Sequence, residues 1–338
     1  MTEKKLLTIC TAAYNAELCI SRMLDSILLC NNRSMMEIIV VNDGSTDKTK
    51  SIVENYSLKY PDIIKLVNKS NGGSGSARNV AFKIAEGKYL KIIDADDLVK
   101  TDELEKFIKE LAITDADVIW NGFIKRNGYS GCDELDDFAS KYINKNESIE
   151  LETLGLNIPD HYLMHGITYR TAIIQEHELR LSEGTPYVDL EYQILPVPYI
   201  NKVSYINHAF YIYNYGLEGQ SMDPQVVIKK EEKIKGLVKG ILDYKQRFYD
   251  LSPTQMKMMN IMAAQACVMH YIVYFNQENF KLKDKFVEID KYYKNYDEEV
   301  WRMIPKSSEY AKLFRMFNYL GYYPMVIAHK IRRRLGKV

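Results

Sequence analysis

Short apolar runs alternate with longer segments of helical spacing along about the first hundred residues of the chain. Four apolar runs of five residues are each expected to form a buried strand, and each is followed by a segment with helical spacing. The expected strands are Leu6–Cys10, Glu37–Val41, Ile63–Val67 and Tyr89–Ile93. The expected helices are Glu17–Leu29, Lys48–Lys59, Ser74–Glu86 and Asp102–Leu111. This alternation predicts an α/β fold with a mainly parallel sheet and helices on both faces.

The pattern becomes less regular in the middle of the chain. The run Asp117–Trp120 is expected to form a further strand, whereas the polar segment 125–146, rich in glycine and aspartate, is expected to form a loop. Beyond it we expect a helix at Thr171–Glu178 and strands at Val203–Ile206 and Phe210–Tyr213. The regular succession of βαβ units is therefore confined to the first part of the chain.

The last third of the chain has a helical pattern. Val226–Phe248 shows helical spacing, Ser252–Pro253 is typical of a helix start, and Met256–Phe275 is apolar nearly all round, as in a buried helix. Two or three further helices are expected after it. The change in composition predicts two domains, residues 1–221 and a helical domain at residues 222–338.

Charge balance and cysteine usage restrict the functional class. Lysine and arginine together number 45, as do aspartate and glutamate, so no net charge favours a nucleic acid or another strongly charged partner. The five cysteines are scattered and form no C-x-x-C motif, which is typical of reduced thiols. The first residues do not resemble a signal peptide, and no apolar stretch reaches the roughly eighteen residues of a membrane span. These features favour a cytoplasmic protein.

The carboxy-terminal segment is strongly basic. No acidic residue follows Glu309, and the apolar patch Tyr322–Ile327 lies among the basic positions. These basic positions are Lys312, Arg315, Lys330, Arg332, Arg333, Arg334 and Lys337. Two interpretations remain open: a solvated terminal helix, or an anchor attracted to anionic lipid, to which each basic residue would contribute about 1 kcal/mol.

Three acids, Asp94, Asp96 and Asp97, directly follow the fourth expected strand. Carboxylates this close repel one another unless a cation lies between them. Asp94 and Asp96 are two positions apart, so in an extended chain they point the same way and could bind one Mg²⁺ or Mn²⁺ ion. A solvated acidic loop is the alternative. The position after a buried strand favours the metal site, because α/β enzymes bind ligands at the carboxyl ends of strands.

Residues able to bind ligands follow each of the first four strands and should converge at one edge of a parallel sheet. In chain order they form the motifs Y-N-A-E, V-N-D-G-S-T-D, N-G-G-S-G-S-A-R-N and I-I-D-A-D-D. With these motifs the chain resembles family 2 of the GT-A glycosyltransferases, densely over about the first hundred residues and more sparsely to about residue 221. The resemblance implies a Rossmann-like GT-A catalytic domain and transfer of a sugar from a UDP-sugar.

The resemblance also implies a set of donor-binding positions. They are Ala12, Tyr14, Glu17, Asp43, Arg78, Asp94, Ala95 and Gln220. Asp43 would accept a hydrogen bond from uracil, although the dipeptide Asp-Gly more often forms a turn. Arg78, in the first turn of a helix after a glycine-rich loop, would meet the diphosphate, with a surface arginine as the alternative. The glycines do not fit G-x-G-x-x-G, since the third would fall at Arg78.

For the metal ion, Mn²⁺ or Mg²⁺, the resemblance implies direct contact with Asp96 and a contact of Asp94 with the ion, a water or the ribose. The ion would stabilise the negative charge that develops on the departing diphosphate. His208 would complete this metal site, with a structural histidine as the alternative. His161 and His165 are left unassigned.

The general base implied by the resemblance is Asp189, which stands where the family has the aspartate of a Glu-Asp pair. It would remove the proton from an acceptor hydroxyl, with Glu191 as the second choice and an exposed helix residue as the alternative for both. Val188 departs from the usual glutamate. A single base and an in-line displacement would invert the anomeric centre.

The implied acceptor is a glycan, a glycoprotein or a lipid-linked molecule, and the implied location is the cytoplasm, at the inner face of the cell membrane. A homo-oligomer is compatible with the sequence. The alternative function is a non-catalytic protein that binds a nucleotide sugar or serves as a scaffold for a glycosyltransferase. Such a protein should lose Asp96 or Asp189, and both are present. The sequence does not identify the sugar.

Overall fold

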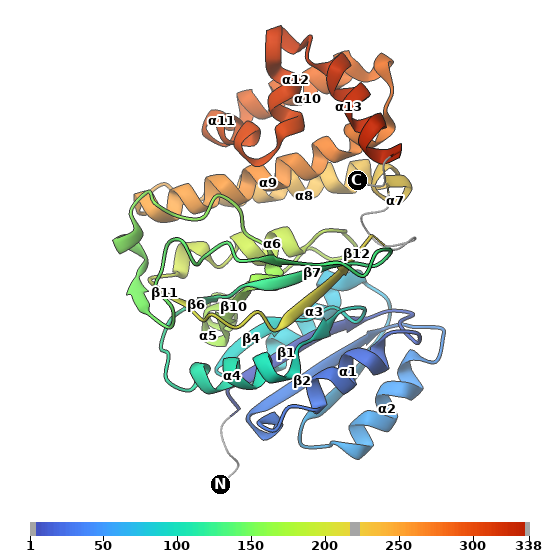
Figure 1. Ribbon diagram of the computed structural model, residues 1–338, viewed down its shortest axis with the longest axis vertical. Coiled ribbons are helices and arrows are strands. Elements are labelled where there is room, and N and C mark those ends of the chain that lie inside the picture. The colour runs from blue at the N-terminus through green and yellow to red at the C-terminus, as the bar shows by residue number, and fades with distance from the viewer. Residues whose placement is uncertain (1–4, 217–223, 335–338) are drawn as a thin grey trace. The chain divides into compact units, whose positions relative to one another are not determined.

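The computed structural model describes residues 5–216 and 224–334 and divides into two compact units, residues 1–217 and 218–338 (Figure 1). Each unit is described by itself. The domain boundary expected near residue 222 lies outside the described residues and stays a prediction.

A mixed eight-stranded sheet forms the centre of the first unit, with the strand order β3-β2-β1-β4-β10-β6-β11-β9. Its strands are β1 Leu7–Ala13, β2 Met36–Asp43, β3 Ile64–Lys69, β4 Tyr89–Ile92, β6 Val118–Trp120, β9 Ser148–Glu150, β10 Ile167–Arg170 and β11 Lys202–Tyr205. The first four strands pair in parallel, as predicted. β10 is antiparallel to both β4 and β6, and β9 is antiparallel to β11, so the second half of the sheet is mixed.

A smaller sheet in the first unit has the order β5-β12-β7-β8. Its strands are β5 Leu98–Val99, β7 Phe123–Asn127, β8 Asp133–Asp136 and β12 Tyr211–Tyr215. Most of β7 and all of β8 lie in the segment 125–146, so the loop expected there is interrupted by two strands, while 128–132 and 137–146 are irregular as expected. β8 is an edge strand whose first three side chains are exposed, and it therefore lacks the apolar alternation that reveals a half-buried strand.

Helices pack against both faces of the larger sheet. Apolar side chains of α1 (Ile20–Leu28) and α4 (Thr101–Leu111) form one core with Leu7 and Ile9 of β1. α3 (Gly73–Ile84) contacts β1 and β2. Thr8, which lies between Leu7 and Ile9 on β1, points to the opposite face of the sheet. The remaining helices of this unit are α2 Thr49–Lys59, α5 Thr171–Glu176 and α6 Asp189–Ile194.

The second unit is helical. Its helices are α7 Pro224–Lys229, α8 Glu231–Lys245, α9 Pro253–Gln277, α10 Lys283–Tyr296, α11 Glu298–Ser307, α12 Glu309–Tyr319 and α13 Tyr322–Arg334, with a short 3₁₀ turn, η5, at Phe280–Leu282. The single helix expected at Val226–Phe248 is interrupted at Lys230, and four helices follow α9 where two or three were expected. α9 begins with a capping box, in which Ser252 and Gln255 each satisfy the other's backbone N–H.

The long helix α9 forms the core of the second unit, where α7, α8, α11, α12 and α13 all contact it. By length and composition alone α9 could cross a membrane, which the sequence pattern did not predict. However, 78% of the residues in its most apolar stretch are buried inside the protein. Packing by the neighbouring helices therefore accounts for its apolar character.

A buried carboxylate, Asp290, stabilises the helices of the second unit. It is fully buried and accepts hydrogen bonds from side chains of four residues on α9, α11 and α12. The donors are the Tyr271 hydroxyl, the Trp301 indole, the Arg315 guanidinium and the Tyr319 hydroxyl. The Arg315 guanidinium approaches it to 2.6 Å, so the buried negative charge has a direct cationic partner.

Candidate active site

The acid cluster lies in a tight turn between β4 and β5, and β12 of the smaller sheet fixes this turn. The Tyr211 hydroxyl donates to one carboxylate oxygen of Asp97 at 2.7 Å, and the Asn214 backbone N–H donates to the other at 2.7 Å. The Asn214 side chain also donates to the backbone carbonyl of Asp96 at 2.9 Å. Asp97 is buried, Asp94 is half-buried and Asp96 is exposed. Three closely spaced acids are thus held at three different depths.

Burial raises the pKa of Asp97 well above its ordinary value, and the nearby charges of Asp94 and Asp96 raise it further. The two hydrogen bonds from Tyr211 and Asn214 oppose this rise only in part. A carboxylate in this position is stabilised either by taking up a proton or by a cation placed among the three acids. This electrostatic arrangement is the one expected of a cation site.

Arg78 on α3, which was predicted to bind the diphosphate, contacts the acid cluster. Its side chain is buried, and one guanidinium nitrogen donates to an Asp94 oxygen at 2.6 Å. The Nε atom is buried without a hydrogen-bond partner in the described part of the chain. α3 begins at Gly73, one residue earlier than expected, so Arg78 is its sixth residue and lies in the second turn. The surface-arginine alternative is therefore wrong.

His165 lies with the acid cluster, although no motif in the sequence pointed to it. Among the described residues, Asp94, Asp97 and His165 each place a potential metal-ligating atom within 4.8 Å of those of the other two. Burial, with the charges of Lys91 and Arg78, lowers the pKa of His165 to about 3, so its imidazole is neutral. Its Nδ1 has no hydrogen-bond partner within the residues that the structure describes. A neutral imidazole beside two carboxylates matches the donor set of a divalent metal site.

A buried lysine on β4 fixes the backbone that carries His165. The Lys91 ammonium is fully buried and donates to the carbonyl oxygens of Met164, His165 and Ile167 at 3.2, 2.5 and 3.0 Å. Burial lowers the pKa of Lys91 well below its ordinary value. The ring of His165 also stacks on Tyr213, with centroids 4.1 Å apart. A lysine inside a buried strand was the one sequence signal that could have directed attention to this position.

Asp189 is the first residue of α6, and its charge lies close to those of Arg78 and Asp94. Burial raises the pKa of Asp189, Arg78 opposes this rise, and Asp94 adds to it. The preceding residue but one, Tyr187, has a left-handed backbone with φ of 61°. Such strain in a residue with a side chain is frequent at functional sites. The charges of Asp189, Arg78 and Asp94 thus act on one another, and the role of Asp189 as general base stays a prediction.

The loop before α6 is anchored to α3, which explains how Asp189 reaches Arg78. The Asn79 side chain both donates to the Leu181 carbonyl at 2.9 Å and accepts from the Leu181 N–H at 2.8 Å. Glu191 accepts from the N–H and the hydroxyl of Ser182 at 2.6 and 2.5 Å. Both Glu191 oxygens are thereby occupied within this loop, so the side chain fixes the loop and is not available as a base in this arrangement.

Asp43 has a clear structural role at the end of β2. It is buried and accepts from the Lys69 ammonium at 2.8 Å and from the N–H groups of Gly72 and Gly73 at 3.0 and 2.8 Å. These bonds hold the glycine-rich loop before α3 against β2. A hydrogen bond to uracil would have to share this carboxylate, so the base-binding role of Asp43 stays a prediction.

The other predicted donor residues occupy the loop after β1 or lie outside the described chain. Glu17 accepts from the Lys48 N–H at 2.9 Å, which ties this loop to the start of α2. Tyr14 is exposed and Ala12 and Ala95 are partly or largely buried near the same sheet edge. Gln220 lies outside the described residues.

The structure does not bring His208 to the acid cluster. Its Nδ1 lies 2.8 Å from a carboxylate oxygen of Glu103 on α4. His208 is therefore held by a structural partner, and the histidine that reaches Asp94 and Asp97 is His165.

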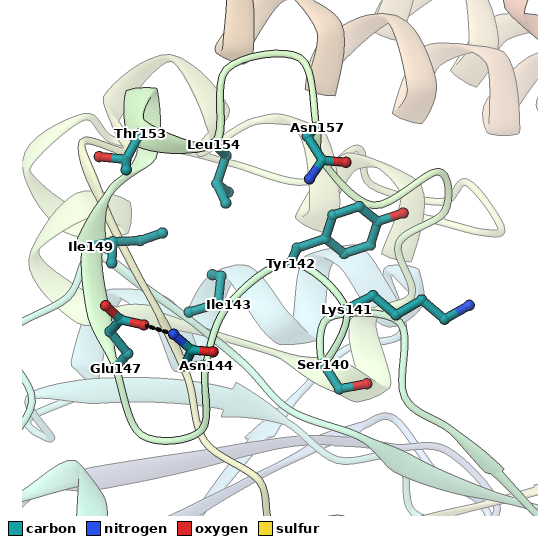
Figure 2. Close-up of a pocket in the computed structure, with 10 residues that line it drawn as sticks. All are labelled: Ser140, Lys141, Tyr142, Ile143, Asn144, Glu147, Ile149, Thr153, Leu154 and Asn157. Carbon is teal, nitrogen blue, oxygen red and sulfur yellow. Dashed lines mark hydrogen bonds between the residues drawn. The ribbon is translucent and has the colours of Figure 1, made fainter.

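Two cavities lie in the irregular segment of the first unit. One, of about 290 Å³, is lined by residues between Ser140 and Asn157 (Figure 2). The other, of about 380 Å³, is lined by Lys125, Asp136 and His161 among others. Neither is lined by Asp94, Asp97 or Asp189.

Comparisons with known proteins agree with this architecture. A model of glycosyl transferase family 2 matches residues 8–175. The teichoic acid poly(glycerol phosphate) polymerase of Staphylococcus epidermidis is 29% identical over 250 residues, which are 72% of this chain and 32% of that protein. The match thus spans about a third of the length of that relative.

Solved structures resemble both parts of the chain. TarS 1–349 of Staphylococcus aureus, in complex with UDP-GlcNAc, superposes with a TM-score of 0.64 at 18% identity and covers 98% of this chain and 92% of that one. The mannosyltransferase PcManGT of Pyrobaculum calidifontis, in complex with GDP-Man and Mn²⁺, gives a TM-score of 0.56 at 17% identity, with coverage of 100% and 89%. The fold is thus that of a GT-A glycosyltransferase. The chain belongs to glycosyltransferase family 2.

Proposed function

We propose that this glycosyltransferase is metal-dependent and inverting, and that it moves a sugar from a UDP-sugar to an acceptor hydroxyl with Asp189 as general base. The observation that supports this most directly is the grouping of Asp189, Asp94 and Arg78 at the carboxyl edge of the sheet. A single displacement at a sugar diphosphate requires a base for the acceptor, here Asp189, and positive charge at the diphosphate, here from Arg78 and the cation proposed at Asp94.

In the proposed reaction Asp189 takes the proton of the acceptor hydroxyl. The acceptor oxygen forms a bond to the anomeric carbon while the bond from this carbon to the diphosphate oxygen breaks, and the electron pair leaves with UDP. The raised pKa of Asp189 makes it a stronger base than an exposed aspartate. Because one displacement takes place, the anomeric configuration is inverted. Turnover should fall at acidic pH as Asp189 becomes protonated, at a pH above the ordinary aspartate pKa of about 3.9.

The residues present fit a divalent cation. Asp94, Asp97 and His165 supply two carboxylates and a neutral imidazole with an unpartnered Nδ1 in the described structure, and the exposed Asp96 adjoins them. A bound Mn²⁺ or Mg²⁺ would supply Lewis-acid stabilisation of the diphosphate. The Mn²⁺ in the mannosyltransferase complex supports this proposal. Arg78, paired with Asp94, would place a second positive charge on the same side of the donor.

The metal proposal can be tested without turnover. Titration of the metal-free protein with Mn²⁺ should raise its melting temperature, and His165→Phe should weaken Mn²⁺ affinity about tenfold or more. His177→Phe is the matched control, because His177 stacks on Tyr199. Equal Mn²⁺ affinity in all three proteins would exclude His165 as a ligand, and no Mn²⁺ effect on the wild type would contradict the metal site itself.

The donor is proposed to be a UDP-sugar because TarS binds UDP-GlcNAc in the same fold. The mannosyltransferase binds GDP-Man, so the fold also accommodates guanine nucleotides. Nucleoside diphosphate release should therefore be measured with a panel of UDP- and GDP-sugars, with and without EDTA. Release from UDP-sugars that stops on metal removal is the expected result. Release from GDP-sugars alone would contradict the uridine proposal.

The acceptor is proposed to be a glycan, a glycoprotein or a lipid-linked polymer at the cytoplasmic face of the cell membrane. The support is the likeness to a teichoic acid polymerase, together with the basic carboxy-terminal segment. Addition of each acceptor class to the donor assay, with product analysis by mass spectrometry, tests this part separately.

A further inference from the structure

The second unit has an exposed apolar face formed by η5, the turn before α13 and α13 itself. Its members are large apolar side chains whose exposed fractions lie between 43% and 77%. They are Phe280, Phe317, Leu320, Tyr323, Ile327 and Ile331. η5 and α13 are in contact, and the rings of Phe280 and Tyr323 lie 6.0 Å apart, so residues distant in sequence form one surface.

α13 is apolar on the side that faces water as well as on the side that faces the protein. Tyr322, Met325 and Val326 are fully buried, and Tyr323 and Ile327 are exposed at a spacing of four residues. A helix at the surface of a soluble unit normally presents polar side chains to water. An outer apolar face of this kind marks a surface that binds something.

The backbone before α13 holds one member of this face, Phe317, outward. Phe317, Asn318 and Tyr319 all have left-handed backbones, with φ of 51°, 53° and 68°. This turn leaves the Phe317 ring 77% exposed. It is fixed from below, because the Tyr319 hydroxyl donates to the buried Asp290 at 2.8 Å. The exposure of Phe317 is thus built into the packed structure.

Basic side chains lie directly beside the apolar ones. The Lys330 ammonium is 5.0 Å from the centre of the Phe280 ring, and the Lys283 ammonium is 5.4 Å from that of Tyr323. The sequence continues with arginine at 332, 333 and 334 and has no acid after Glu309. Two nearby acids are Glu278, which is 3.1 Å from His329, and Asp284 in the first turn of α10. Positive charge therefore dominates around the apolar face.

The occupant that fits this surface is an anionic lipid bilayer, not a second protein. Protein interfaces have few lysines in their apolar centre. Aromatic rings and aliphatic side chains interleaved with lysine and arginine are instead typical of helices that lie in the headgroup region. α13 has 13 residues and is about 20 Å long, too short to cross a hydrocarbon core of about 30 Å. It can only lie along the surface.

We propose that the exposed apolar face of η5 and α13 docks onto a membrane that contains anionic lipid, with Phe317, Leu320, Ile327 and Ile331 inserted and Lys283 and Lys330 at the phosphates. This inference deepens the proposed membrane-side location and rests on that part of the proposed function, not on the transfer chemistry. It assigns the contact to a folded surface of the second unit and not to the basic sequence alone.

Flotation of the full-length chain with lipid vesicles tests the proposal. The wild type should bind vesicles of phosphatidylcholine with about one third phosphatidylglycerol, and high salt should weaken this binding. The double variant Ile327→Glu/Ile331→Glu and the double variant Lys283→Glu/Lys330→Glu should each lose about tenfold or more in partitioning. Tyr249→Glu is the matched control, because Tyr249 is 90% exposed elsewhere in the same unit, and it should bind like the wild type.

Three outcomes would overturn the proposal. They are equal binding to neutral and anionic vesicles, unchanged binding of both double variants, and a wild type that is dimeric by light scattering but becomes monomeric in Ile327→Glu/Ile331→Glu. The third outcome would identify a second copy of this chain as the occupant. Release of UDP from soluble donor, measured without vesicles, should be the same in all these proteins. A failure of docking is therefore distinguishable from a failure of the proposed chemistry.

Discussion

Two buried aspartates, one in each unit, have opposite surroundings. Asp290 in the helical unit accepts hydrogen bonds from four side chains, one of them the guanidinium of Arg315. Asp97 in the first unit accepts from one hydroxyl and one backbone N–H, and the negative charges of Asp94 and Asp96 raise its pKa. The first carboxylate is fully compensated by the protein. The second receives fewer hydrogen bonds and lies among like charges, which is the arrangement we propose for a cation site.

The difference separates a structural charge from a functional one. A buried ion pair with saturated hydrogen bonds fixes how helices pack, and its loss should be measured as lost stability. A buried acid among other acids lowers stability, and it is retained where its charge is used. Asp136 represents an intermediate case, since it contacts the Lys125 ammonium at 2.5 Å and the titratable His161 ring at 3.2 Å.

The largest expected effect is on catalysis, at Asp189. Asp189→Asn removes the proposed base while it keeps the shape of the site, so turnover should fall by about 10²–10⁴-fold. UDP affinity by calorimetry and the free energy of unfolding should remain within error of the wild type. Normal turnover would show that Asp189 is not the base.

The next largest effect is on stability, at Arg315. Arg315→Met leaves Asp290 buried without its cation and should lower the free energy of unfolding by about 3–5 kcal/mol, measured by urea denaturation. Arg302→Met is the matched control. Arg302 forms an exposed pair with Glu298 on α11, so its loss should cost less than about 1 kcal/mol. Similar losses in the two variants would contradict the structural role of Asp290.

Asp97→Asn should not lower the free energy of unfolding, in contrast to the loss of the cation beside Asp290. Without the third carboxylate the repulsion within the acid cluster falls, and the Tyr211 hydroxyl can turn to match the new amide. The free energy of unfolding should be equal to or higher than that of the wild type, while Mn²⁺ affinity falls about 10–100-fold. A clear loss of stability with unchanged Mn²⁺ affinity would make Asp97 a structural acid like Asp290.

The smallest effect concerns His161 beside Asp136. The hydrogen bond to Asp136 raises the pKa of His161, burial opposes the rise, and Asp160 adds to it. A histidine whose pKa is higher in the folded state stabilises the protein below its unfolded pKa of about 6.5, and this contribution is lost as the pH rises through the folded pKa.

Since the His161 side chain is 44% exposed, solvent screening keeps its contribution below about 1 kcal/mol. His161→Gln should therefore lower the melting temperature slightly at about pH 6 and hardly at all at about pH 9. A difference that does not change with pH would exclude an electrostatic origin.

The sequence predicted those parts of the site that depend on local pattern and on parallel pairing. Asp94, Arg78 and Asp43 follow regular strands, and parallel strands bring their carboxyl ends together whatever happens later in the chain. Asp189 came from the family resemblance. Its position beside Arg78 results from the link between Asn79 and Leu181, which are 102 residues apart and show no common pattern.

The sequence could not predict the contacts that tertiary structure adds to these elements. His165 reaches the acids because β10 enters the sheet antiparallel and Lys91 holds the preceding turn, and neither fact is visible as periodicity. Histidine is a common metal ligand, but the His208 ring lies against the Glu103 carboxylate of α4. Edge strand β8 escaped detection because its outward side chains are mostly polar.

The hydrogen bonds from β12 to the acid turn affect the order in which the site forms during translation. Strands β1, β2 and β4 can pair as soon as about the first hundred residues have left the ribosome, since domains begin to fold from the amino terminus during synthesis. The bonds that fix Asp97 come from Tyr211 and Asn214, which are 114 and 117 residues further along. Until then Asp97 lacks both of these bonds, although Arg78, which precedes the acids in the chain, is already present to pair with Asp94. The acid turn is therefore fixed late in translation, only after β12 of the smaller sheet has been made.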